Sequence, residues 1–138
     1  MAEKRPPRSL QTDADREFWD WCNKGELRIQ KCDDCGAMPF PPVEACESCG
    51  SDKLSWTPMS GEATLFSWCS INRDYYRGAF PLPWDTIMVE LTEGPVLMSN
   101  PVGFSNAEAE LGMPLRLAWL DCEDEHGAYR LPVFERAS

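Results

Sequence analysis

Apolar side chains recur at helical spacing close to the N-terminus. The apolar positions are Phe18, Trp19, Trp21 and Cys22. Thr12 precedes them and is a residue type that caps helix N-termini, and acidic residues follow it where the helix dipole favours them. Gly25 comes directly after the apolar cluster and is a typical helix stop. The pattern therefore predicts a short helix between Thr12 and Gly25.

The aromatic load of this helix has two interpretations. In the first, the aromatic residues pack against the core of the same chain. In the second, Phe18, Trp19 and Trp21 dock onto another subunit, because so short a helix has few places to bury that much apolar surface. The sequence leaves both interpretations open, and we carry the docking helix forward as a hypothesis.

From Gly61 onward the pattern changes to the alternation that is typical of strands. Five segments show it: residues 62–71, residues 85–91, residues 96–99, the stretch with Leu115, Leu117 and Trp119, and the stretch with Leu131 and Val133. Glu93-Gly94 suits a turn between the second and third segments. Ser105 and Glu108 form a capping box for a short helix that ends near Gly112 and Pro114.

Five strands with one helix between the third and fourth have the order of a five-stranded Greek-key barrel of the OB type. We therefore expect a mainly β protein with an N-terminal arm and helix at residues 1–25. A small cysteine-bearing module follows at residues 26–58, and the barrel occupies residues 59–138. Residues 1–11 carry Lys4, Arg5 and Arg8 against Glu3, which predicts a flexible basic arm.

Four cysteines form two copies of the motif CxxCG: Cys32, Cys35, Cys46 and Cys49. Two intervening residues let a tight turn aim both sulfurs of a pair at one point, and ten residues separate the pairs. Four thiolates are the ligand set of a closed structural zinc site. Two disulfides, a redox CxxC and a rubredoxin-like iron site are the alternatives. Zinc is the prediction, with a structural and not a catalytic role.

The remaining composition narrows the function. Lys and Arg number 13 against 23 Asp and Glu, so the net charge of −10 disfavours non-specific binding to a polyanion. No signal peptide or membrane span is visible, which predicts a cytoplasmic protein. Cys22, Cys69 and Cys122 each lie in an apolar pattern and are expected to be buried. The one histidine, His126, lies in a polar turn and is expected at the surface. No cysteine therefore has a candidate base beside it, and no catalytic constellation is visible.

The connection at residues 72–84 is long and combines arginines with aromatic side chains. It contains Arg73, Tyr75, Tyr76, Arg77 and Phe80. This mixture is typical of binding hot spots and of sites that stack bases or pair phosphates. The alternative is a loop that folds over the barrel end with its aromatic residues in its own core. The composition therefore predicts that these five residues form a contact surface.

The ordered set of motifs resembles the DUF35 family. The matching elements are Phe18-Trp19, Gly25-Glu26-Leu27, the two CxxCG motifs, Phe40-Pro41-Pro42, Gly61, Glu93-Gly94-Pro95, Gly112-Met113-Pro114 and Leu131-Pro132-x-Phe134. They cover roughly residues 15–136. The resemblance implies an N-terminal helix, a rubredoxin-like zinc ribbon and a C-terminal OB-fold.

The same resemblance implies a function. DUF35 proteins are small subunits of thiolase-superfamily enzymes, including lipid-transfer-protein-type aldolases that cleave steroid-CoA side chains, and the catalytic residues lie mainly on the large subunit. We expect a non-catalytic zinc subunit that supports assembly and the CoA or acyl passage, in a heterotetramer of two large and two small subunits. The loop residues Arg73, Tyr75, Tyr76, Arg77 and Phe80, chosen for their chemistry, are expected to contact CoA or the partner and to line this passage. The alternatives are a single-stranded nucleic-acid-binding OB protein and a scaffold without CoA contact.

Overall fold

The N-terminal helix forms where the sequence predicts it. The computed structural model describes residues 3–4, 8–73 and 84–137. Helix α1 spans Asp13–Asn23, and the Thr12 hydroxyl caps it by accepting a hydrogen bond from the Asp15 backbone N–H at 3.1 Å. The chain leaves the helix through Gly25, whose φ of 79° is in the left-handed region that glycine tolerates best. None of the described helices has the length and apolar character needed to span a bilayer.

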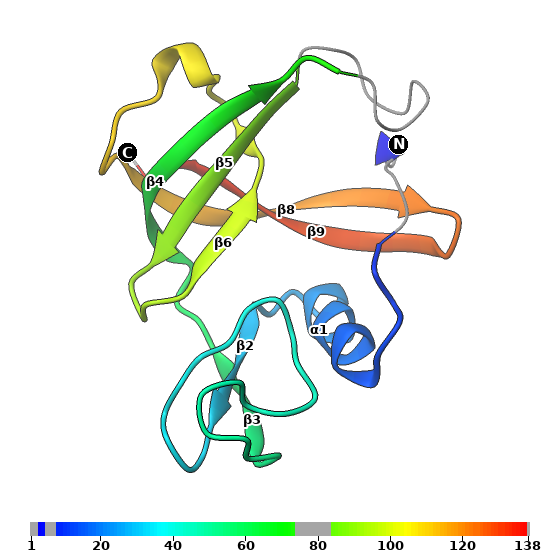
Figure 1. The fold of residues 1–138 in the computed structure, drawn as a ribbon. Coiled ribbons are helices and arrows are strands. Elements are labelled where there is room, and N and C mark those ends of the chain that lie inside the picture. Colours follow the sequence, from blue (N-terminus) through cyan, green and yellow to red (C-terminus); the bar gives the residue numbers. More distant parts are fainter. Residues whose placement is uncertain (1–2, 5–7, 74–83, 138) are drawn as a thin grey trace.

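A small antiparallel sheet follows the helix. It pairs β2 (Arg28–Cys32) with β3 (Leu54–Pro58). The register places Cys32, the last residue of β2, opposite Leu54, the first residue of β3. The segment between the two strands contains the other three cysteines of the CxxCG motifs. Figure 1 shows this small sheet and its long connection below the main sheet, beside α1.

The main sheet contains all five predicted strands. In the described residues its path is β6-β5-β4-β8-β9-β7, and β1 pairs with β8 outside that path. The strands are β1 (Glu3–Lys4), β4 (Glu62–Ile71), β5 (Trp84–Leu91), β6 (Val96–Ser99), β7 (Pro101–Val102), β8 (Pro114–Asp124) and β9 (Gly127–Arg136). A 3-10 helix, η1 (Asn106–Glu108), has the predicted capping box of Ser105 and Glu108.

The predicted OB-type order is confirmed, but the sheet does not close into a continuous barrel. Along the seam between β6 and β9, the Ser99 hydroxyl donates to the Pro132 carbonyl at 2.9 Å. The Phe134 backbone N–H donates to the Asn100 carbonyl at 3.3 Å. Pro132 and Pro101 have no backbone N–H, so each removes a donor from a ladder that would close the sheet. The two-residue strand β7 pairs in parallel with β9.

One core joins the main sheet to the helix and the small sheet. Fully buried side chains come from the strands of both sheets and from the helix: Cys22, Ile29, Leu65, Ile87, Val89, Leu91, Leu115 and Phe134. The β8–β9 hairpin reaches beyond the rest of the sheet and passes over α1 (Figure 1). Helix α1 contacts β9 along this extension, so the hairpin fixes the helix against the sheet.

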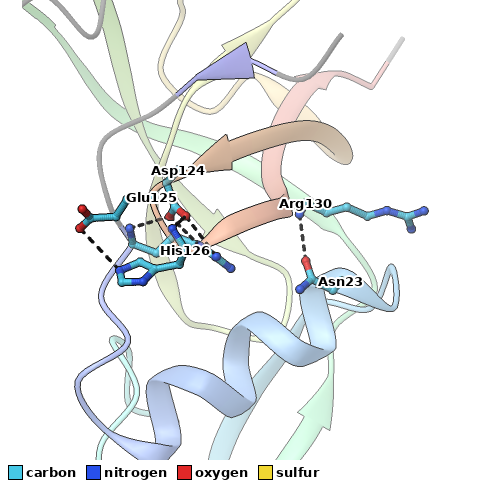
Figure 2. Close-up of polar contacts among 6 residues, drawn as sticks. Asn23, Asp124, Glu125, His126 and Arg130 are labelled. Carbon is cyan, nitrogen blue, oxygen red and sulfur yellow. Dashed lines mark hydrogen bonds and ion pairs between the residues drawn. The ribbon is translucent and has the colours of Figure 1, made fainter.

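The prediction of a flexible arm is wrong for the residues that lead into the helix. Glu3 and Lys4 pair in parallel with Cys122 and Glu123 of β8. Arg8 forms an ion pair with Asp124 at 2.8 Å, and their side chains are 8% and 0% exposed. Figure 2 shows Asp124 beside His126 at the end of the hairpin, and Asn23 of α1 accepting a hydrogen bond from the Arg130 backbone N–H. The start of the chain is therefore attached to the hairpin.

Candidate functional site

The two CxxCG motifs fold into two turns with the same hydrogen bonds. In the first, the Cys32 N–H donates to Ala37 at 2.8 Å and the Gly36 N–H donates to the Cys32 carbonyl at 2.9 Å. In the second, the Cys46 N–H donates to Ser51 at 2.8 Å and the Gly50 N–H donates to the Cys46 carbonyl at 2.7 Å. The repeated pattern means that each motif presents its two sulfurs in the same way.

The glycine after each motif is required by backbone conformation and not by space. Gly36 and Gly50 have φ values of 80° and 77°, and a Cβ at either position would meet nothing within 4 Å. A side chain would fit, but the left-handed conformation would strain most residues other than glycine. The glycines therefore let the chain curl around the sulfurs.

All four sulfurs meet at one point. The Sγ atoms of Cys32, Cys35, Cys46 and Cys49 lie within 4.8 Å of one another. The Cys32–Cys49 and Cys35–Cys46 sulfurs are 3.5 Å and 3.6 Å apart, well beyond a disulfide bond of about 2.05 Å. A tetrahedral ZnS₄ centre with Zn–S bonds of about 2.3 Å has S···S edges of about 3.8 Å. The arrangement fits a four-coordinate metal and not two disulfides.

Electrostatics also favour a cation at this point. The Cys35 backbone N–H lowers the pKa of Cys32 to about 7. The Cys49 and Ser48 backbone N–H groups likewise lower the pKa of Cys46. The Ser51 N–H lowers the pKa of Cys49, but the neighbouring thiols of Cys32 and Cys35 outweigh it and raise that pKa to about 12. Four sulfurs this close cannot all ionise without a positive ion between them.

The donor set and its support define a structural zinc site. Four thiolates satisfy tetrahedral zinc and leave no position for a substrate, so the ion would hold the fold together and would not act on substrate. Gln30, which is buried, fixes the connection between the motifs: its amide donates to the Val43 carbonyl at 2.9 Å and accepts from the Val43 N–H at 2.8 Å. This bond ties the proline-rich segment to β2.

The three other cysteines divide. Cys22 and Cys122 are buried, as predicted, and burial raises the pKa of the Cys22 thiol to about 12. Cys69 is exposed on β4, so the prediction that it is buried is wrong. Residues 66–71 alternate in sequence like a half-buried strand, but this end of β4 lies past the β-bulge between Leu65 and Ser67 and is largely exposed.

The structure describes only part of the predicted contact loop. Arg73 is exposed, two residues after β4 ends at Ile71. Tyr75, Tyr76, Arg77 and Phe80 lie outside the described residues. The contact of all five residues with CoA or a partner stays a prediction.

The aromatic residues of α1 contribute to this chain's own structure. Phe18 is buried, with its ring 5.1 Å from Trp19 and 5.4 Å from Phe40. Trp19 is half-buried against Tyr129, and Trp21 lies under Lys24 and Arg28. The docking role of the helix stays a prediction, and Phe18 is the least available of the three residues for it.

Sequence reasoning missed a set of exposed apolar side chains on the main sheet and on the η1–β8 connection. These are Phe66, Trp68, Met98 and Leu111, with exposed fractions of 52%, 39%, 69% and 77%. Phe66 lies at the bulge of β4. Met98 lies on the edge strand β6, opposite Met88 of β5. The alternation of apolar and polar residues in one strand does not reveal a bulge. Nothing in the sequence therefore distinguished these exposed residues from core residues.

The fold and the cysteine site define a protein with an N-terminal helix, a rubredoxin-type zinc ribbon and an OB-type sheet. Two family models match it: the ChsH2 rubredoxin-like zinc ribbon domain over residues 19–55 and the ChsH2 C-terminal OB-fold domain over residues 56–120. The chain belongs to the DUF35 family, in its ChsH2-like form. The expected boundaries at residues 25 and 58 stay predictions.

A solved structure of similar fold is the chain of the Ltp2-ChsH2(DUF35) aldolase, with 30% identity and a TM-score of 0.81. The match covers 95% of this chain and 100% of that one. A Thermomonospora curvata protein described as a probable enoyl-CoA hydratase alpha subunit is 34% identical over 124 residues, 89% of this chain and 38% of the relative. The Mycobacterium tuberculosis 3-oxo-4,17-pregnadiene-20-carboxyl-CoA hydratase alpha subunit is 33% identical over 107 residues, 78% of this chain and 34% of the relative. The chain thus spans little more than a third of either relative.

Proposed function

We propose that this chain is a non-catalytic, zinc-containing accessory subunit of a thiolase-fold or lipid-transfer-protein-type acyl-CoA enzyme. The observation that carries the proposal is the end-to-end likeness to the DUF35 chain of an aldolase, with a four-cysteine site built for structure and not for catalysis. The expected assembly is a heterotetramer of two large and two small subunits. In it, the catalytic residues belong to the large subunit.

The reaction that we propose for the complex is cleavage of a carbon–carbon bond in a bulky acyl-CoA, either by retro-aldol chemistry or by thiolysis. Support comes from the names of the relatives, one an aldolase and one a hydratase of a pregnadiene carboxyl-CoA. A steroid-derived acyl group is the substrate class that these names favour. Fold likeness alone does not determine substrate, so the substrate needs an assay.

Two exposed features of the chain suit a partner surface. Phe66 and Trp68 expose large side chains on β4, next to the segment that leads to Arg73. Exposed apolar groups near a cation are typical of interface hot spots. We propose that this end of β4 and the following loop face the large subunit, where the loop borders the CoA or acyl passage.

The first test is a tagged pull-down from the native host, with mass spectrometry and metal analysis of the eluate. We expect a stoichiometric thiolase-fold partner and one zinc ion per small subunit. Light scattering of the purified complex should give the mass of two large and two small subunits. A zinc-loaded monomer that captures no partner would contradict the proposed function.

An arginine in the loop gives a finer prediction. Replacing Arg77 with alanine should lower kcat/KM of the complex for acyl-CoA about tenfold or more, because a hydrogen bond to a charged group contributes about 1.5–3 kcal/mol. Zinc content should not change. The matched control is Arg116→Ala, an exposed arginine on β8. Unchanged turnover at both limiting and saturating acyl-CoA would remove Arg77 from the passage.

The alternative function, single-stranded nucleic-acid binding, predicts that the chain retains an oligonucleotide, which the proposed subunit function does not. An OB-type sheet with exposed aromatic residues allows such binding, but a net charge of −10 supplies no electrostatic attraction for phosphates. A filter-binding titration at low salt distinguishes the two. Retention of an oligonucleotide that weakens steeply as salt rises would favour the alternative.

A further inference from the structure

A row of apolar side chains crosses one face of the main sheet. Met98 of β6 lies opposite Met88 of β5 in the antiparallel register, and directly opposed residues share one face of a sheet. Met88 in turn lies opposite Ser67 of β4, and Phe66 is the extra residue of the bulge beside it. The three strands lie side by side (Figure 1), so the row spans two strand spacings, or about 10 Å, from β6 to β4.

The row continues past β4 to the η1–β8 connection. The Gly112 backbone N–H donates to the Leu65 carbonyl at 2.8 Å, and the Leu65 N–H donates to the Met113 carbonyl at 2.9 Å. Leu111 therefore lies beside the bulge that contains Phe66, and it is 77% exposed. An exposed apolar set that crosses three strands and a loop is typical of a surface that contacts another molecule.

The charges around this row have one sign. Strands β4, β5 and β6 contain three acidic residues and no lysine or arginine. Glu90 shares the face of Met88, two residues further along β5, and Glu110 directly precedes Leu111. Both glutamates are exposed. Neither forms an ion pair within residues 8–73 and 84–137. Their carboxylates can therefore pair with cations of another molecule.

We propose that this face docks onto the large subunit of the proposed complex, at a surface with an apolar centre and lysine or arginine residues around it. Met98 and Phe66, exposed by 69% and 52%, form the centre of the docking face, and Glu90 and Glu110 form its charged rim. A second copy of this chain would bring the same carboxylates together, and like charges across an interface are unfavourable. Thioether side chains also adapt to the shape of an apolar partner.

This docking face rests on the proposed function and extends it from the end of β4 to β5 and β6. The test captures the thiolase-fold subunit from the native host with the full, zinc-loaded chain as bait, and mass spectrometry quantifies the subunit recovered per chain. Met98→Glu and Phe66→Glu place a carboxylate in the apolar row. Each should lower recovery about tenfold or more, because central apolar anchors supply most of the binding energy. Ala128→Glu adds the same charge at an exposed position of β9 next to the hairpin turn, and it should recover as much as the wild type.

Charge reversal tests the rim. Surface plasmon resonance with the purified large subunit should show that Glu90→Lys slows association about threefold or more at low salt, because a basic rim on the partner then repels it. The deficit should shrink as salt rises, since exposed charges are screened beyond about 10 Å at 0.1 M ionic strength. Unchanged or faster association of Glu90→Lys would overturn the basic rim of the partner.

The outcomes separate the docking face from the proposed function. Wild-type recovery in both Met98→Glu and Phe66→Glu would overturn the docking face alone. A wild-type chain that captures no thiolase-fold subunit would overturn the proposed function, and the docking face with it. A dimer of the isolated wild-type chain that Met98→Glu dissociates would overturn the choice of partner, because a second copy would then cover the face. Circular dichroism and zinc content check each fold, and Met98→Gln or Phe66→Gln replaces a glutamate variant that does not fold.

Discussion

Replacing Cys46 with serine is expected to abolish zinc binding and to unfold the cysteine-bearing segment between β2 and β3 while the main sheet remains folded. The segment between β2 and β3 has few buried apolar groups, so the metal supplies most of its folding free energy. Apparent binding free energies of structural zinc are about 10–16 kcal/mol, far more than so small a core contributes. Cys46 is preferred to the exposed ligands Cys35 and Cys49 because it is buried. A serine at this position also leaves a poorly coordinating hydroxyl inside the site.

Metal analysis and hydrogen exchange measure this result. We expect about one zinc ion per wild-type chain and none in Cys46→Ser, together with fast amide exchange across residues 33–53, the segment between β2 and β3. Cys69→Ser is the matched control, since it is the same substitution at an exposed cysteine outside the cluster. A Cys46→Ser chain with full zinc and native exchange would show that the metal does not hold the ribbon. Iron in place of zinc in the wild-type chain would change the identity of the metal and leave its structural role unchanged.

Local chemistry explains which parts of the fold the sequence predicts. Thr12 and Gly25 determine where the helix begins and ends, through the capping side chain of Thr12 and the left-handed backbone of Gly25. The two CxxCG motifs determine the cysteine cluster, because the short spacing and the glycine dictate the turn. The capping box of Ser105 and Glu108 forms within four residues. Each of these features depends on neighbours along the chain.

The features that escape prediction depend on residues far apart. Arg8 and Asp124 are 116 positions apart, and no pattern links them. The open seam depends on Pro132 meeting Ser99, which the strand pattern of either segment does not reveal. An apolar cavity at the same seam combines residues from the helix, the ribbon and three strands. Tertiary packing determines these features, and single-strand periodicity carries no information on them.

The attachment of the N-terminus to the hairpin is the second feature with a large expected effect. Nε of Arg8 donates to Oδ2 of Asp124 at 2.8 Å, and Nη2 donates to Oδ1 at 3.3 Å. The guanidinium carbon lies 4.2 Å from the ring centre of Tyr129 and 5.6 Å from that of Trp19. Arg8 therefore joins the chain start, α1 and the hairpin by one side chain that is both paired and stacked.

Replacing Arg8 with alanine should lower the free energy of unfolding by about 3–5 kcal/mol, because it leaves the Asp124 carboxylate buried without its counter-ion. Urea denaturation measures the change. Arg16→Ala, which removes an exposed ion pair to Asp13, is the control and should change stability by about 0.5 kcal/mol or less. The double variant Arg8→Met with Asp124→Leu should be less destabilised than Arg8→Ala, since no buried charge remains. A loss in Arg8→Ala no larger than in the control would refute the role of the pair.

The same pair makes the effect of Arg8→Ala depend on pH. Burial raises the pKa of Asp124, but the hydrogen bonds from Arg8 and the His126 backbone outweigh it and lower the pKa from 3.8 to about 2. A carboxyl whose folded pKa is depressed stabilises the fold above its unfolded pKa, and that stabilisation is lost as the pH falls through the folded pKa. The difference in stability between wild type and Arg8→Ala should therefore be largest above about pH 4 and shrink toward pH 2. A difference that stays constant from pH 6 to 2 would mean that Arg8 acts through its stacking on Tyr129 and not through the charge of Asp124.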